Sequence, residues 1–223
     1  MAFQPRQVLL IFILMLQAAL PLKAQESLIE TATHYKEAIV TVRSVQLRKN
    51  GGLIAQFTNQ ASGVIIDSNG TIVTNLHTIR NVDKIGIILH NNLRLGARIV
   101  ELWPQHDLAL LKITPPLALT AMPLADSDRL QLGDEIINIG TSYYRQGTLT
   151  GGKITGLGRS NTTNTLEIIQ VDLELFEGDS GGALLNRNGE LIGMLSSKNM
   201  KKTAAAYAIP SNKIKNLYLK AMK

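Results

Sequence analysis

Apolar residues in this chain recur in short runs of four to eight residues that are rich in Ile, Val, Leu and Thr. Polar turn signals separate the runs, notably the Asn-Gly pairs in "DSNG" before Thr71 and "NRNG" before Glu190. Runs of this length between residues that tolerate positive φ predict β-strands joined by hairpins. About twelve such strands predict an all-β antiparallel sandwich or barrel. The predicted strands are "AIVTVRSV", "GLIAQFT", "GVIID", "TIVTN", "KIGIIL", "LGARIVEL", "LALLKI", "DEIINIG", "GKITGLG", "LEIIQVDL", "GALLN" and "ELIGML".

Prolines break the strand pattern once, in "TPPLALTAMPLADSDRL" at residues 114–130. We interpret residues 116–130 as a connector between two β subdomains of similar size, residues 25–115 and residues 131–210.

Helices are expected only near the two ends of the chain. One is predicted in "QESLIETATHYKEAI", which leads into the first subdomain, and one in residues 211–223. In the second, Ser211 can cap the helix, and Ile214, Leu217 and Tyr218 share one face.

Residues 1–24 have the pattern of a secretory signal peptide: Arg6 precedes an apolar run, and Ala24 offers a small residue for cleavage. The run, residues 8–20, is shorter than the ~20 residues of a membrane span. Leu22 is not the ideal small residue two positions before Ala24, so a retained anchor is the alternative. We expect an exported protein, periplasmic or secreted, with no stable membrane insertion after cleavage.

Composition excludes several classes of site. The chain has no Cys, so disulfides, thiol catalysis, Cys-based zinc sites and thiol redox chemistry are ruled out. The formal charge of +6 would fall to +4 with the loss of Arg6 and Lys23. The cations are scattered apart from "SKNMKK", which indicates a solvated surface and no nucleic-acid partner.

Candidate chemistry centres on "FEGDSGGALLNRNGELIGM", where glycines surround Ser180. A nucleophilic serine needs a base and an orienting acid. Among the four histidines, His77 lies where the predicted strand "TIVTN" ends, and Asp107 immediately precedes "LALLKI". Each residue has an ordinary structural reading when taken alone, whereas His34 and His90 are expected at the surface.

The order His77, Asp107, Ser180 is that of the two-barrel serine proteases. With "SGVIIDSNGTIVTNLHTI", "GDSGGALLNRNGELIGM" and "YAIPSNKIKNL", the chain resembles the HtrA/Deg family of trypsin-like serine proteases from about Ala38 to Leu217. The resemblance implies two six-stranded antiparallel β-barrels with short terminal helices and the active site between them. It also implies no cofactor and no metal, polypeptide substrates, and a monomer or homotrimer.

The resemblance assigns a role to each residue. His77 would be the general base, Asp107 its orienting acid, and Ser180 the nucleophile of an acyl-enzyme mechanism. Gly178 and Ser180 would supply the amides of the oxyanion hole, while Gly181 and Gly182 would keep Cβ atoms away from the substrate.

The resemblance also places the pocket for the substrate side chain preceding the cut. Leu175 matches an aliphatic pocket residue, whereas Glu174 occupies the position at which an acid selects Lys or Arg. We expect Glu174 to face solvent and the specificity to be aliphatic, with basic specificity as the alternative. Leu195, Ser196 and Ser197 would complete the pocket and pair with an extended substrate.

Several features depart from the family pattern. The chain ends at Lys223, so no PDZ module is expected, and Asp179 stands where the family usually has Asn, with no partner evident from the sequence. The Gly- and Asn-rich segment 140–165 is expected to regulate the oxyanion hole. "GTLTGGK" matches the spacing of a phosphate-binding loop, but Ile154 follows in place of a hydroxyl, so we predict a turn entering a strand.

Two rival functions stay open at this point. One is a catalytically silent or chaperone-like peptide-binding module on the same fold. The other is an esterase that uses the same acyl chemistry.

Overall fold

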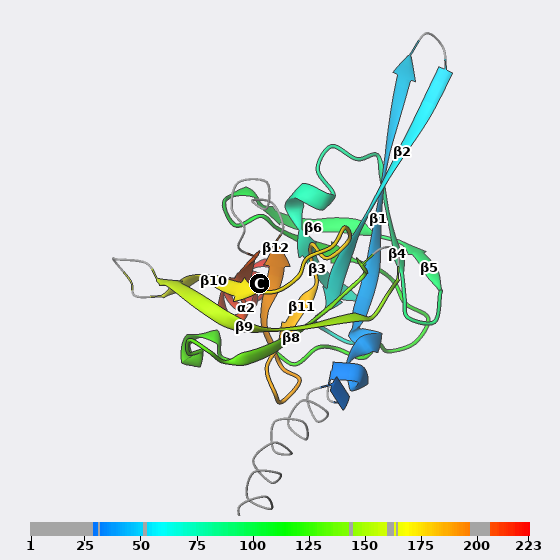
Figure 1. Ribbon diagram of the computed structural model, residues 1–223. Helices are drawn as coiled ribbons and strands as arrows, with labels where there is room; N and C mark the ends of the chain where they lie inside the picture. Colours follow the sequence, from blue (N-terminus) through cyan, green and yellow to red (C-terminus); the bar gives the residue numbers. More distant parts are fainter. Residues whose placement is uncertain are drawn as a thin grey trace, which may run out of the picture.

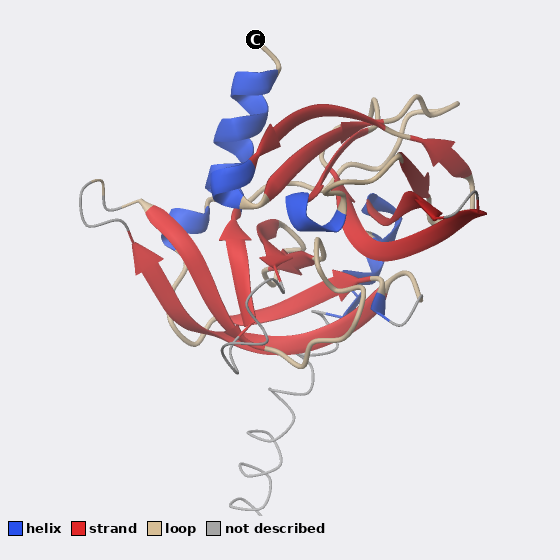
Figure 2. Ribbon diagram, turned by 90° about the horizontal axis from the view of Figure 1, so that it is seen from above, coloured by secondary structure: helices blue, strands red, loops and turns tan. Residues whose placement is uncertain are grey.

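The computed structural model describes residues 29–30, 32–50, 53–142, 145–159, 163, 165–196 and 206–223. It is an all-β protein with two curved sheets side by side and a C-terminal helix, α2 (Ser211–Ala221), against them (Figures 1 and 2). The expected fold class is therefore confirmed. The predicted signal peptide, residues 1–24, lies outside the described residues.

The first sheet has the order β5-β4-β1-β2-β3-β7-β6. Its two outermost strands, β5 and β6, follow one another in the chain with only Ala97 between them. Counted as one bent strand that pairs first with β4 and then with β7, they give the six strands predicted for this barrel. The strands are β1 (Ile39–Asn50), β2 (Leu53–Ile65), β3 (Thr71–Asn75), β4 (Lys84–Ile88), β5 (Arg94–Gly96), β6 (Arg98–Trp103) and β7 (Leu108–Lys112).

The second sheet is a closed barrel in the order β10-β13-β12-β11-β8-β9. "GTLTGGK" leads into β9 with Gly147 at a φ of 77°, which confirms the turn and strand expected there. The strands are β8 (Glu135–Gly140), β9 (Thr148–Arg159), β10 (Leu166–Asp172), β11 (Ala183–Leu185), β12 (Leu191–Ser196) and β13 (Ala206–Pro210).

Two strand assignments from the sequence were wrong. "GLIAQFT" and "GVIID" belong to one strand, β2, because the polar residues between them stay paired with β1. Strand β13 was not predicted, since its sequence "AYAIP" is short and ends in proline. The two Asn-Gly hairpins are confirmed: Gly70 and Gly189 have φ values of 90° and 76° in the turns before β3 and β12.

Ser211 was predicted to cap helix α2 from just outside it, but Ser211 is the first residue of the helix and Pro210 is at the cap position. The Ser211 hydroxyl donates to the Ala125 carbonyl and caps no helix amide, so the cap expectation was wrong. Ile214 is buried as expected, with Leu217 and Tyr218 packed against the same core. Near the N-terminus, residues 29–30 and 32–34 are helical, and a 3-10 turn η1 (Lys36–Ala38) precedes β1.

The apolar core has three parts: one inside each sheet and one between the two sheets. Residues 113–134 connect the sheets and bond to both, through Met122 N to Ile65 O (2.8 Å) and Leu191 N to Pro123 O (2.7 Å). These bonds and the shared core fix how the sheets face each other. Among the described residues, no helix is long and apolar enough to span a membrane.

Candidate active site

His77 lies in a 3-10 turn, η2 (Leu76–Thr78), directly after β3. Its neighbours Leu76 and Thr78 are buried, and the Thr78 hydroxyl donates to Asn75 O (2.7 Å). The anchored turn leaves the imidazole partly exposed at the junction of the two sheets, with a side-chain exposure of 28%.

Asp107 follows a second 3-10 turn, η3 (Pro104–His106), in the left-handed conformation with φ 52°. Its carboxylate accepts hydrogen bonds from His77 Nδ1 (2.7 Å), His77 N (3.0 Å) and the Ser196 hydroxyl (3.0 Å). Burial raises the pKa of Asp107, but the hydrogen bonds and charge of His77, with the bond from Ser196, outweigh burial and leave that pKa below its usual value. Asp107 therefore stays ionised next to the imidazole.

The Ser180 hydroxyl completes the arrangement. Its Oγ lies 3.2 Å from His77 Nε2, and the residue is 7% exposed. Because a carboxylate only accepts, His77 Nδ1 carries a proton, and Nε2 of the neutral ring is left to accept one from the serine. The structure thus brings together the three residues that the chain order pointed to, across 103 residues between His77 and Ser180.

The residues before Ser180 form a tight turn, residues 176–179, which we call the glycine turn. Asp179 N donates to Phe176 O (3.2 Å), and Gly178 has a φ of 100° at the third position, as a type II turn requires. A Cβ on Gly178 would lie 2.1 Å from Thr141 O. Only glycine fits both the conformation and the close approach.

Gly181 and Gly182 serve a different purpose from the one expected. A Cβ on Gly181 would lie 2.0 Å from Ser62 O, and one on Gly182 would lie 2.7 Å from Asn138 Oδ1. These glycines allow close approach between segments of the protein, so the expectation that they keep space for substrate was wrong.

Asp179 has a partner that the sequence did not indicate. The side chain is fully buried and accepts hydrogen bonds from the Ser142 hydroxyl and from Phe176 N (2.8 Å). Burial raises the pKa of Asp179, and these two hydrogen bonds only partly oppose that effect. Ser142 lies in the segment 140–165 that was expected to influence the site.

A cavity of about 290 Å³ opens in front of Ser180. Leu175 lines it, as expected, whereas Glu174 is exposed and is not part of its wall. The cavity is lined by Asn59, Gln60, Ala61, His77, Thr78, Leu175, Phe176, Glu177, Gly178 and Ser180.

Two of the predicted pocket residues lie elsewhere. Leu195 is buried in the core of the second barrel, and its N and O already bond to Gly182 O and Gly181 N (both 2.9 Å). The Ser196 hydroxyl donates its hydrogen bond to Asp107 and not into the cavity. The alternation along β12 directs the Leu195 side chain into the core and the Ser196 side chain toward the acid, so neither side chain lines the cavity in front of Ser180. Ser197 lies outside the described residues.

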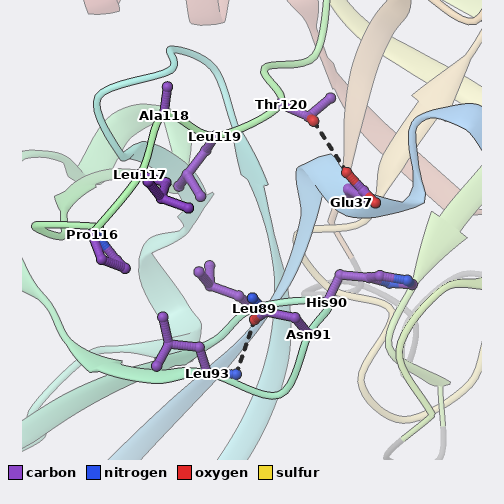
Figure 3. A pocket seen from close by; sticks show the side chains of 10 residues that line it. All are labelled: Glu37, Leu89, His90, Asn91, Leu93, Pro116, Leu117, Ala118, Leu119 and Thr120. Carbon is purple, nitrogen blue, oxygen red and sulfur yellow. Dashed lines mark hydrogen bonds between the residues drawn. The ribbon is translucent and has the colours of Figure 1, made fainter.

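A second cavity, of about 220 Å³, lies between the β4–β5 turn and the connector (Figure 3). Leu89, Leu93 and Leu117 contribute to its wall, and a hydrogen bond from Thr120 to Glu37 (3.3 Å) lies at its edge. No residue of the His77, Asp107 and Ser180 cluster lines this cavity.

Comparison with known proteins agrees with this geometry. A family model described as "Trypsin-like peptidase domain" matches residues 61–194. The chain is 41% identical over 174 residues to the periplasmic serine endoprotease DegP of Salmonella typhimurium, covering 75% of the chain and 37% of that relative. It is 40% identical over 173 residues to DegP of Escherichia coli, covering 75% of the chain and 36% of that relative. It is 39% identical over 167 residues to the periplasmic pH-dependent serine endoprotease DegQ of Escherichia coli, covering 72% of the chain and 37% of that relative.

The chain spans a little over a third of the length of these relatives. The matched region contains His77, Asp107 and Ser180, and the resemblance inferred from the sequence is confirmed. The chain belongs to the trypsin-like peptidase family and is related within it to the Deg serine endoproteases.

Proposed function

We propose that this chain is a serine endopeptidase that cleaves extended or misfolded polypeptides through an acyl-enzyme intermediate. The observation that carries the proposal is the chain of contacts from Asp107 to His77 Nδ1 (2.7 Å) and from His77 Nε2 to Ser180 Oγ (3.2 Å). Family membership and the names of the Deg relatives support the same activity.

In the first step, Ser180 Oγ bonds to the carbonyl carbon of the scissile peptide while its proton moves to His77 Nε2. The imidazolium that forms is stabilised by the Asp107 carboxylate. His77 then gives the proton to the leaving amine, and the C–N bond breaks to leave an acyl-enzyme. Water repeats the sequence on the ester, with His77 again acting as base and then as acid.

The negative charge that develops on the carbonyl oxygen would be bound by the amides of Gly178 and Ser180. The conformation of the glycine turn supports this role, since Gly178 has a φ of 100°, a value that only glycine adopts readily. A single donor of this kind typically lowers the activation barrier by about 3 kcal/mol.

Substrate preference follows from the cavity in front of Ser180. Leu175 and Phe176 give its wall an apolar part, and Glu174 faces solvent. We therefore propose cleavage after aliphatic residues. The 13-residue apolar run near the N-terminus and the periplasmic relatives support export to the periplasm.

The test is cleavage of casein and of a peptide library by the wild-type protein, with Ser180→Ala as the inactive variant. Ser68→Ala, an exposed serine in the β2–β3 turn, is the matched control. We expect cleavage after Val, Ala, Ile or Leu by the wild-type and control proteins and none by Ser180→Ala. Casein binding without cleavage by the wild-type protein would favour a chaperone-like module. Hydrolysis of short-chain esters alone would favour an esterase, and either result would overturn the proposal.

A further inference from the structure

We propose that Ser62 is a positioning residue for the oxyanion hole, and that its hydroxyl holds the glycine turn in its active conformation. The inference rests on the proposed function. It assigns a role to a residue of β2 that lies 116 residues from its partner in the glycine turn.

Ser62 contacts both residues whose amides would form the hole. Its hydroxyl donates to Gly178 O (2.7 Å), and its backbone N–H donates to Ser180 O (2.8 Å). The same hydroxyl accepts from Thr141 N (2.8 Å), directly after β8. Ser62 is fully buried, so no water competes for these bonds.

The hydroxyl contact matters because the Gly178–Asp179 peptide has few other restraints. The carbonyl end is held by Ser62, and the N–H end is held by the longer bond from Asp179 N to Phe176 O (3.2 Å). Glycine rotates about its backbone bonds at little cost. With the hydroxyl removed, the Gly178 carbonyl loses this anchor, and rotation about the φ and ψ bonds of Gly178 can then change the direction of its N–H, which belongs to the preceding peptide.

Ser62 also ties the nucleophile to the strand that leads to the base. Its carbonyl accepts from the Thr74 hydroxyl (2.7 Å) on β3, three residues before His77. Gly181, the residue after the nucleophile, packs against the same carbonyl: a Cβ at this position would lie only 2.0 Å from Ser62 O. One buried residue therefore fixes the glycine turn and the nucleophile against the sheet that carries the imidazole.

Removal of the hydroxyl by Ser62→Ala tests this role. A matched control is Ser211→Ala, since Ser211 is also fully buried and also donates to a backbone carbonyl (2.9 Å), but it lies in α2. For Ser62→Ala, kcat per site titrated with a phosphonate should fall about 10- to 100-fold, because a misplaced donor costs less than a deleted one. KM should change less than about twofold. The control should leave both constants within about twofold of wild type.

Hydrogen exchange of peptides covering residues 176–182 gives a readout independent of turnover. Exchange should be faster in Ser62→Ala and unchanged in Ser211→Ala. If Ser62→Ala does not fold, Ser62→Cys replaces it, and its weakly donating thiol should give an intermediate kcat and intermediate exchange. A kcat and an exchange rate equal to those of the control would overturn the inference. If the wild-type protein has no turnover, the proposed function fails instead, and the exchange comparison still decides whether Ser62 holds the turn.

Discussion

The substitution Asp107→Asn tests the mechanism with the least change in shape. The wild-type carboxylate faces three donors: His77 N and His77 Nδ1 at its two oxygens, and the Ser196 hydroxyl. An asparagine has one oxygen and one NH₂ group, so it can no longer accept from all three. The structure determines which way the amide turns.

His77 N is a backbone donor that cannot change its role, so the asparagine oxygen is expected to face it at the position of Oδ1. The NH₂ group then takes the position of Oδ2 and donates to His77 Nδ1, while the Ser196 hydroxyl turns to accept. The imidazole proton is displaced to Nε2, which lies 3.2 Å from Ser180 Oγ. In that tautomer the ring cannot take the serine proton.

We expect kcat to fall by about 10⁴-fold at neutral pH, which corresponds to about 5.4 kcal/mol of transition-state stabilisation. KM should be little changed, because Asp107 does not line the cavity in front of Ser180. The assay is turnover of a chromogenic peptide with an aliphatic residue before the cut, normalised to folded protein. Ser196→Ala is the control: it removes one hydrogen bond to the same oxygen without reversing the tautomer, so its kcat should fall by less than about tenfold.

The pH dependence of stability gives a second readout for Asp107. The pKa of Asp107 is lowered in the folded state, so its ionised form contributes stability above the unfolded value of 3.8, and this contribution is lost as pH falls through the folded pKa. Any stability advantage of wild type over Asp107→Asn should therefore shrink below pH 3.8. Retention of more than a tenth of wild-type kcat by Asp107→Asn would refute the reasoning about the tautomer.

Three further substitutions have distinct expected outcomes. Burial raises the pKa of Asp179 above 3.8, so the ionised carboxylate destabilises the folded state at pH values above the folded pKa. Asp179→Asn should therefore raise the unfolding temperature at neutral pH, and this gain should disappear as pH falls toward 3.8. Gly181→Ala forces a Cβ to 2.0 Å from Ser62 O at a φ of 84°, so denaturant unfolding should show a loss of at least about 2 kcal/mol, and wild-type stability would contradict the packing described here. Tyr218→Phe removes the hydrogen bond to Asp67 (3.1 Å), so it should cost about 1 kcal/mol without changing kcat, whereas a change in kcat would link α2 to the site.

Most strands could be predicted because their apolar residues alternate or cluster between Gly- and Asn-rich turns. The prediction failed where polar residues continue a strand. "NQAS" interrupts the apolar pattern of β2, yet its backbone stays paired with β1, and Ser62 within it is fully buried. A burial pattern set by tertiary contacts is not visible in a local hydropathy pattern.

The positions of His77, Asp107 and Ser180 could be predicted because each stands beside a recognisable strand or glycine-rich turn. The supporting residues could not, since their partners lie far away in the sequence. The contact between Ser142 and Asp179 spans 37 residues, and that between Ser196 and Asp107 spans 89. Neighbours on β12 also point to different surroundings, so the sequence did not indicate that the Leu195 side chain enters the core and that Ser196 donates to Asp107.

The central claim is that His77 activates Ser180, and the most direct measurement is labelling by a fluorophosphonate followed by intact mass. At neutral pH the wild-type protein should take up one label per chain, on Ser180. Ser180→Ala should take up none, and His77→Ala should react at least about 10³-fold more slowly. Labelling of His77→Ala at the wild-type rate, or no labelling of folded wild-type protein, would contradict the account.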